Sequence, residues 1–172
     1  MPDPMREEER ARPSRASCEE CGAVVPEGRA TCQKLFDEVL ARELSDPRYA
    51  RLHRLTVDTY SLQHPGQFMR SGKSFAAHLT GMCAALGGGD APAIHRAVQR
   101  WLDGPKAVER PVELPPRQRG ERTIAHVHAA TNPWEHERRV REWADSTWNA
   151  WRAHHDLAWQ WIARATAEAP KR

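Results

Sequence analysis

The residues best suited to chemistry are cysteines and histidines, and many of them gather in the first half of the chain. Cys18 and Cys21 form a Cys-x-x-Cys-Gly motif, in which Gly22 lets the chain fold back beneath a bound ion. Two thiolates do not complete a tetrahedral site, so the chain has to supply one or two further ligands. Cys32 follows 11 residues after Cys21. The pattern predicts a metal site, and zinc is the expected ion.

Three histidines in the same half of the chain are candidates for the remaining position. His53 and His64 are 11 residues apart, which on one helix separates them by about 16 Å along the axis, so they cannot share an ion. Antiparallel packing of consecutive helices brings His64, and then His78, to the end of the bundle where the helix of Cys32 begins. The expected ligands are Cys18, Cys21, Cys32 and His64, with His78 as the reserve.

Capping residues and the helical spacing of apolar residues predict the elements that carry these ligands. The expected helices are 32–44, 46–63, 71–86, 91–102 and 133–167. They begin at or just after residues suited to a helix start, namely Thr31, Asp46, Ser71, Asp90 and Asn132. Cys83 falls inside the third helix, five residues after His78, and is interpreted as a small buried apolar residue.

The fold class expected from this pattern is all-α, as a single-domain helical bundle with a metal knuckle at its N-terminus. At most one short β-hairpin interrupts it, by pairing 112–114 with 123–127. The helical domain is expected to span 18–167. Residues 1–17, rich in mixed charges and prolines, are expected to form a disordered tail, and 168–172 a short C-terminal tail.

Composition limits the partners that the chain can be expected to have. A net charge of +3 is too small to indicate a nucleic acid or a membrane surface. No apolar run approaches the roughly 20 residues of a membrane span, and the N-terminus lacks the apolar core of a signal peptide. The expected location is the reducing cytoplasm of a bacterium. The expected partner is a small molecule or another protein, rather than a membrane or a nucleic acid.

The last expected helix carries most of the tryptophans and an adjacent pair, His154 and His155. Its apolar residues form two neighbouring stripes, which predicts a helix buried around much of its circumference. Two interpretations of the pair stay open. The imidazoles either supply polar groups to a small-molecule cleft walled by tryptophan, or form hydrogen bonds inside the core.

Several motifs, taken in order, resemble a bacterial domain family of unknown function, over about residues 18–162. They are Cys18-x-x-Cys-Gly-Ala, Cys32 with Val39-Leu-Ala-Arg-Glu43, the run from His53 to Pro65, Ser74 with His78-Leu-Thr-Gly, and the ending from Val140 through Trp151 to His155. The family has no established activity, so the resemblance implies a domain without implying what it does.

A weaker likeness is to the DinB/YfiT-like bundles, which hold a divalent metal on three histidines inside four helices. That family uses a His-x3-His pair on one helix. This chain has no such pair, so the likeness is one of architecture only.

Three functions are compatible with these residues. The first is a zinc-binding helical protein whose metal is mainly structural, and whose Trp/His-lined cleft binds a ligand or partner. The alternative is a metal-dependent enzyme, a hydrolase or transferase, whose ion keeps an open position. Its candidate ligands or bases are His64, His78, His154 and His155, with Asp58 and Tyr60 as candidates for proton transfer. A regulatory or nucleic-acid module using Arg110–Arg122 is disfavoured by the nearly balanced charge.

Overall fold

The computed structural model describes residues 16–168, apart from residue 112 and residues 116–118. Within these residues the chain is all-α, which confirms the predicted fold class. The helices are α2 (Arg29–Ser45), α3 (His53–Gln63), α4 (Pro65–Phe68), α5 (Gly72–Leu86), α6 (Ala91–Asp103), α7 (Ile124–His128), α8 (Pro133–Ala150) and α9 (His155–Ala167), with 3-10 helices at Ala50–Leu52 and Arg152–His154.

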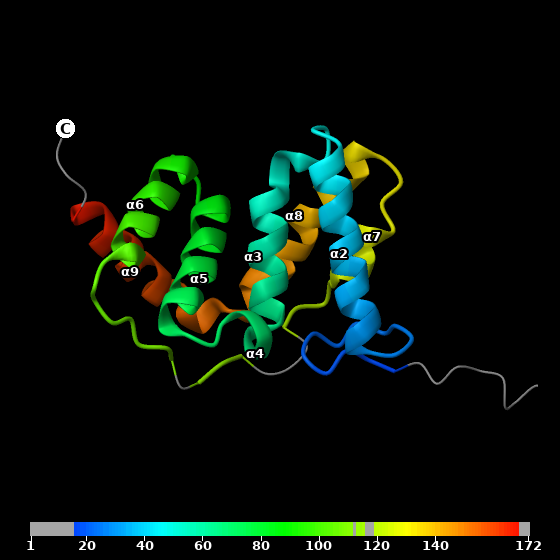
Figure 1. The fold of residues 1–172 in the computed structure, drawn as a ribbon, viewed down its shortest axis with the longest axis horizontal. Helices are drawn as coiled ribbons and strands as arrows, with labels where there is room; N and C mark the ends of the chain where they lie inside the picture. The colour runs from blue at the N-terminus through cyan, green and yellow to red at the C-terminus, as the bar shows by residue number, and fades with distance from the viewer. Residues whose placement is uncertain (1–15, 112, 116–118, 169–172) are drawn as a thin grey trace, which may run out of the picture.

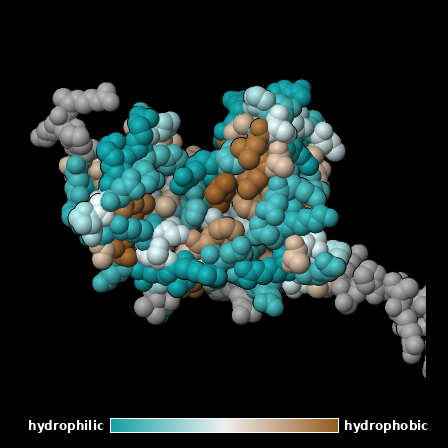
Figure 2. All heavy atoms as spheres, viewed as in Figure 1, coloured by the Kyte–Doolittle hydropathy of each residue, from teal (hydrophilic) through white to brown (hydrophobic). Residues whose placement is uncertain are grey.

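The helices pack as two groups that meet between α3 and α5 (Figure 1). One group contains α2, α3, α7 and α8, and the other contains α5, α6 and α9. The surface is hollowed between the two groups on the face shown in Figure 2. The largest side chains with almost no exposure are Trp143, Trp151, Tyr60 and Phe75. Burial of such aromatic area supplies much of the free energy that holds the groups together.

Three helices begin where the sequence predicts. In each, the side-chain oxygen of the N-cap accepts a hydrogen bond from the backbone amide three residues later, which satisfies a donor that the first turn leaves free. The pairs are Ser71 with Ser74 (3.0 Å), Asp90 with Ala93 (2.9 Å) and Asn132 with Glu135 (2.9 Å).

Two predicted helix starts are wrong. α2 begins at Arg29, so Thr31 lies inside the helix and Gly28 is the N-cap, with a φ of 55°. A Cβ on Gly28 would lie 2.9 Å from the carbonyl oxygen of Ser17, so glycine lets the N-terminal segment approach the helix start. α3 begins only at His53, because the Asp46 carboxylate binds the amide and guanidinium of Arg48 and forms a turn instead of a helix cap.

The one short β-hairpin that the sequence allowed does not form in the described residues. Residues Ile124–His128 form α7, and the structure describes no strand, only an isolated bridge between Ser17 and Val24. Ile124 and Val127 are both buried and three residues apart, a spacing that puts them on one face of a helix but on opposite faces of a strand. Residue 112 of the predicted partner strand lies outside the described residues.

The single helix predicted over 133–167 is broken after Ala150. Trp151 is fully buried at the break, and its indole nitrogen donates to the carbonyl oxygen of Leu62 at 3.2 Å. The His155 ring stacks on Trp148 with centroids 3.8 Å apart, and its Nε2 donates to the Trp148 carbonyl oxygen at 2.9 Å. The break lets α8 pack on α3 and α7 while α9 packs on α5 and α6.

Candidate metal centre

The N-terminal knuckle, residues 16–25, is a tight turn closed by backbone hydrogen bonds. The amide of Cys18 donates to the carbonyl of Ala23 at 2.9 Å, and the amide of Gly22 donates back to the carbonyl of Cys18 at 2.8 Å. Gly22 has a φ of 76°, in the left-handed region that favours glycine. This geometry places the side chains of Cys18 and Cys21 on the same side of the turn as α2 and α3, where both are buried.

Two helices complete the cluster that the knuckle begins. Cys32 lies in the first turn of α2, and His64 is the residue that directly follows α3. The ligand atoms of the four residues lie within 4.8 Å of one another, and each residue is at most 2% exposed. The four residues, Cys18, Cys21, Cys32 and His64, lie close enough together to bind a metal ion.

Three of the six donor–donor distances in the cluster match the edges that a tetrahedral site of this composition would have. With Zn–S of about 2.3 Å and Zn–N of about 2.0 Å, tetrahedral angles give S–S edges of about 3.8 Å and S–N edges of about 3.5 Å. The sulfurs of Cys21 and Cys32 are 3.7 Å apart. His64 Nε2 lies 3.5 Å from the sulfurs of both Cys18 and Cys32. These three distances fit a single ion, and the remaining donor–donor distances are within 4.8 Å.

Tyr60 orients His64 within the cluster. The Nδ1 of His64 donates to the carbonyl oxygen of Tyr60 at 2.8 Å, so its Nε2 lone pair is directed to the thiols. The two rings also stack, with centroids 3.9 Å apart. The Tyr60 hydroxyl in turn lies 3.7 Å from the sulfur of Cys32, as a hydrogen-bond donor. Tyr60 supports two of the four candidate ligands.

The three thiols interact strongly enough to separate their proton affinities. Hydrogen bonds from the thiols of Cys21 and Cys32 lower the pKa of Cys18 well below its ordinary value. Donation to Cys18 raises the pKa of Cys21, and the same interaction raises the pKa of Cys32 to about 12. Burial raises the pKa of Tyr60, so its hydroxyl stays protonated as a donor. A cation at the centre would be needed to make all three sulfurs thiolates.

Residues 16–152 match a family of unknown function, DUF5946. The chain belongs to this family. The match includes all four residues of the cluster and ends inside the 3-10 helix before α9. Comparisons with curated proteins and with solved structures find no match. The likeness to the DinB/YfiT-like bundles therefore stays a prediction.

Of the five ligands predicted for the metal, His78 is the one that the structure does not bring to the cluster. Its Nδ1 donates to the buried carboxylate of Asp58 at 2.9 Å, and the Arg54 guanidinium binds the other oxygen of Asp58 at 2.8 Å. Asp58 is six residues before His64, and His78 is six residues after the start of α5. Because the two helices are antiparallel, this places His78 about 9 Å along the bundle from His64.

The Asp58 carboxylate is packed directly against Gly81 of α5. A Cβ on Gly81 would lie 2.2 Å from Asp58 Oδ2, so Gly81→Ala must displace the carboxylate from Arg54 and His78. We expect a loss of about 3 kcal/mol in the free energy of unfolding, from overpacking and from a buried charge left without its partners. Urea denaturation measures it. In an Asp58→Ala background the same substitution should cost less than about 1 kcal/mol, and equal costs would contradict the contact.

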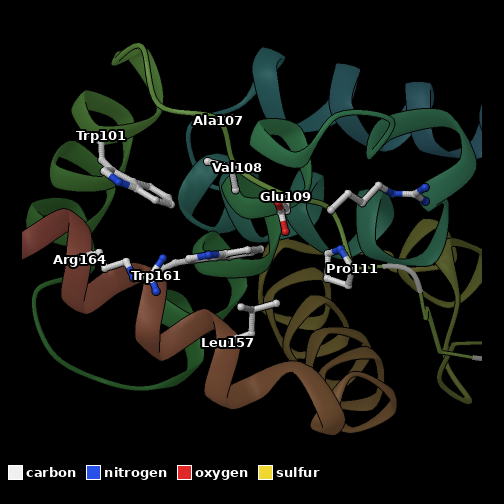
Figure 3. A pocket seen from close by; sticks show the side chains of 9 residues that line it. Trp101, Ala107, Val108, Glu109, Pro111, Leu157, Trp161 and Arg164 are labelled. Carbon is white, nitrogen blue, oxygen red and sulfur yellow. The ribbon is translucent and has the colours of Figure 1, made fainter.

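His154 and His155 are both half-buried, and each donates to a backbone carbonyl. His154 Nε2 binds the carbonyl oxygen of Glu113 at 3.0 Å, whereas His155 spans the break between α8 and α9. A pocket walled by Trp101 and Trp161 lies between α6 and α9 (Figure 3), but neither histidine lines it. The predicted Trp/His-lined cleft therefore stays a prediction, because the lining of this pocket contains two tryptophans but neither histidine.

Sequence reasoning missed a second buried polar cluster, centred on Glu43 of α2. One carboxylate oxygen accepts from Thr56 at 2.6 Å and from His136 Nε2 at 2.9 Å, and the other accepts from His53 Nδ1 at 2.8 Å. Glu43 is 1% exposed. It lies four residues after Val39 on the buried face of α2, so a charged residue on an apolar stripe was the available signal.

Gln63, next to His64, ties the cluster end of α3 to two other segments. Its side-chain nitrogen donates to the carbonyl oxygens of Arg119 and Arg122, at 2.6 and 2.8 Å, and its oxygen accepts from the indole of Trp143 at 2.8 Å. Three hydrogen bonds to a fully buried amide leave it well satisfied. Gln63 therefore fixes the position of His64 through α3, and its role is structural.

Among the described residues, no helix has the length and apolar composition that crossing a bilayer requires.

Proposed function

We propose that the chain is a zinc-binding helical protein in which Cys18, Cys21, Cys32 and His64 hold a mainly structural ion. The observation that carries the proposal is the buried set of four soft or borderline donors, three of whose mutual distances equal the edges of one tetrahedron. Four protein ligands fill the coordination of zinc and leave no position for a reacting water, which is the arrangement of structural sites.

The ion would join three segments of the chain at one point. It would link the knuckle to the start of α2 and to the end of α3. Glu20 adds an exposed contact, in which its carboxylate accepts from the amide of Gly66 at 3.0 Å. The Arg119 guanidinium also donates to the Glu20 carbonyl oxygen at 3.1 Å, and the Arg29 guanidinium lies 3.6 Å from the Glu20 carboxylate. Metal binding would add to these contacts and stabilise the knuckle further, because binding and local folding are one equilibrium.

A second part of the proposal is that a ligand binds in the cleft walled by Trp101 and Trp161. Its support is the cleft between α6 and α9. These two helices lie at the opposite end of the fold from the N-terminal knuckle (Figure 1). In this arrangement one group of helices would be stabilised by the ion, and the other group would bind the ligand.

The alternative of a metal-dependent enzyme has less support. Its candidate acids and bases are engaged elsewhere, since Asp58 is held by Arg54 and His78, and the Tyr60 hydroxyl contacts Cys32. Neither His154 nor His155 belongs to the cluster. An ion with three protein ligands and a water would support this alternative.

The test of the metal site is the zinc content of the purified chain, measured by elemental analysis. The unaltered chain should carry about one zinc ion, and Cys21→Ser should lose most of it together with thermal stability. Cys83→Ser is the matched control, because Cys83 is also a buried thiol but lies outside the cluster. Full zinc content and an unchanged melting temperature in Cys21→Ser would overturn the proposed site. X-ray absorption of the loaded chain counts the ligands.

A further inference from the structure

The cleft between α6 and α9 has the dimensions of a small-molecule site. Its volume is about 630 Å³, which lies within the usual range for ligand pockets. The indoles of Trp101 and Trp161 face it, with ring centroids 6.5 Å apart and planes inclined by 40° (Figure 3). Leu157 completes the apolar surface on α9. Walls of this kind suit a flat apolar ring.

The wall opposite α9 is the segment 107–111, and the structure holds this segment in place. A Cβ on Gly72 would lie 1.6 Å from the carbonyl oxygen of Val108, so the segment lies directly on the start of α5. On one side of it, Lys73 donates to the carbonyl oxygen of Gly104 at 2.7 Å. On the other, His154 donates to Glu113 at 3.0 Å. His154 is thus a positioning residue for the wall of the pocket.

The pocket carries three charged side chains, all exposed at its edge: Glu109, Arg110 and Arg164. Within the described part of the chain, neither guanidinium has an ion pair or hydrogen bond to another side chain. Two arginines against one glutamate give the lining a net charge of +1. An anion placed near Arg164 would gain attraction that a neutral molecule of the same shape would not.

We infer that this cleft binds a small aromatic anion, whose ring lies against the two indoles and whose acidic group meets Arg164. The inference rests on the proposed ligand-binding cleft and adds the chemical class of its ligand. It is independent of the metal, because no member of the zinc cluster lines the pocket.

The experiment compares two probes of one ring skeleton on the full, zinc-loaded chain. They are anilinonaphthalene sulfonate, which is an anion, and the uncharged phenylnaphthylamine. Isothermal titration should give about one sulfonate site per chain, with the neutral probe binding about tenfold more weakly. Absence of binding by both probes would overturn the cleft itself. Equal binding of both would leave the cleft standing and overturn the anionic class.

Charge variants make the test more specific, because removing a positive and removing a negative side chain should change the affinity for the sulfonate in opposite directions. Arg164→Gln should weaken sulfonate binding several-fold, and Glu109→Gln should strengthen it, with neither changing the neutral probe. Trp101→Ala should weaken both probes about tenfold. Trp159→Ala is the matched control, since Trp159 is exposed on α9 and does not line the pocket. Sulfonate binding that is equally sensitive to Trp159→Ala, or insensitive to both charge variants, would overturn the assignment.

Discussion

Removing the proposed zinc ion with a strong chelator should lower the free energy of unfolding by about 4 kcal/mol or more. A ligand present at a thousandfold above its dissociation constant stabilises the folded state by about that amount, and structural zinc is commonly held more tightly. The loss should be largest in the knuckle, because Cys18 and Cys21 would be left as buried thiols at the end of a short turn. Thermal melts with and without chelator, followed by zinc re-addition, measure the change.

Hydrogen exchange shows whether the loss is local. The amides of Cys18 and Gly22, protected by the bonds that close the knuckle, should exchange much faster without the metal. The amides of α6 provide the internal control, because α6 packs on α5 and α9 and does not reach the cluster. Unchanged melting on chelation, or faster exchange spread evenly over α6 and the knuckle, would contradict a structural ion in this position.

The sequence predicted elements best where one side chain decides the local structure. Ser71, Asp90 and Asn132 cap their helices because the capping oxygen and its amide lie within one turn. Predictions failed where a contact with a residue distant in the sequence determines where a helix begins or ends. The break after Ala150 depends on Trp151 reaching Leu62, and the start of α2 depends on Gly28 meeting Ser17. Neither contact leaves a signal within the local sequence.

The candidate site also shows that local signals can be predicted from the sequence and distant contacts cannot. Cys-x-x-Cys-Gly and the antiparallel order of the helices were enough to place Cys32 and His64 with the knuckle. They were not enough to exclude His78. Its position along the bundle, six residues away from the level of His64, depends on the length of α4 and on the pairing of His78 with Asp58. The role of Glu43 was not foreseen, because its partner His136 lies 93 residues away.

Glu43→Gln should destabilise the chain by about 3–5 kcal/mol, the usual cost of removing one partner from a buried ionic cluster. Glu43 joins α2 to α3 through His53 and Thr56, and joins α2 to α8 through His136. The amide of glutamine has one acceptor oxygen for these three donors, and its NH₂ group would face an imidazole N–H. Thr56 and His136 are fully buried and His53 is 35% exposed, so a buried donor shares or loses its acceptor.

The control for this substitution lies on the same helix. Glu38 accepts from His128 at 2.7 Å, a bond of the same chemistry as Glu43 with His136, but the Glu38 side chain is 45% exposed. Glu38→Gln should therefore cost less than about 1 kcal/mol, because water replaces the lost interaction. Urea denaturation at one pH measures both variants. Equal costs would mean that burial does not determine the contribution of Glu43. If Glu43→Gln costs several times more than Glu38→Gln, the cluster joining α2, α3 and α8 stabilises the half of the fold on which the knuckle packs.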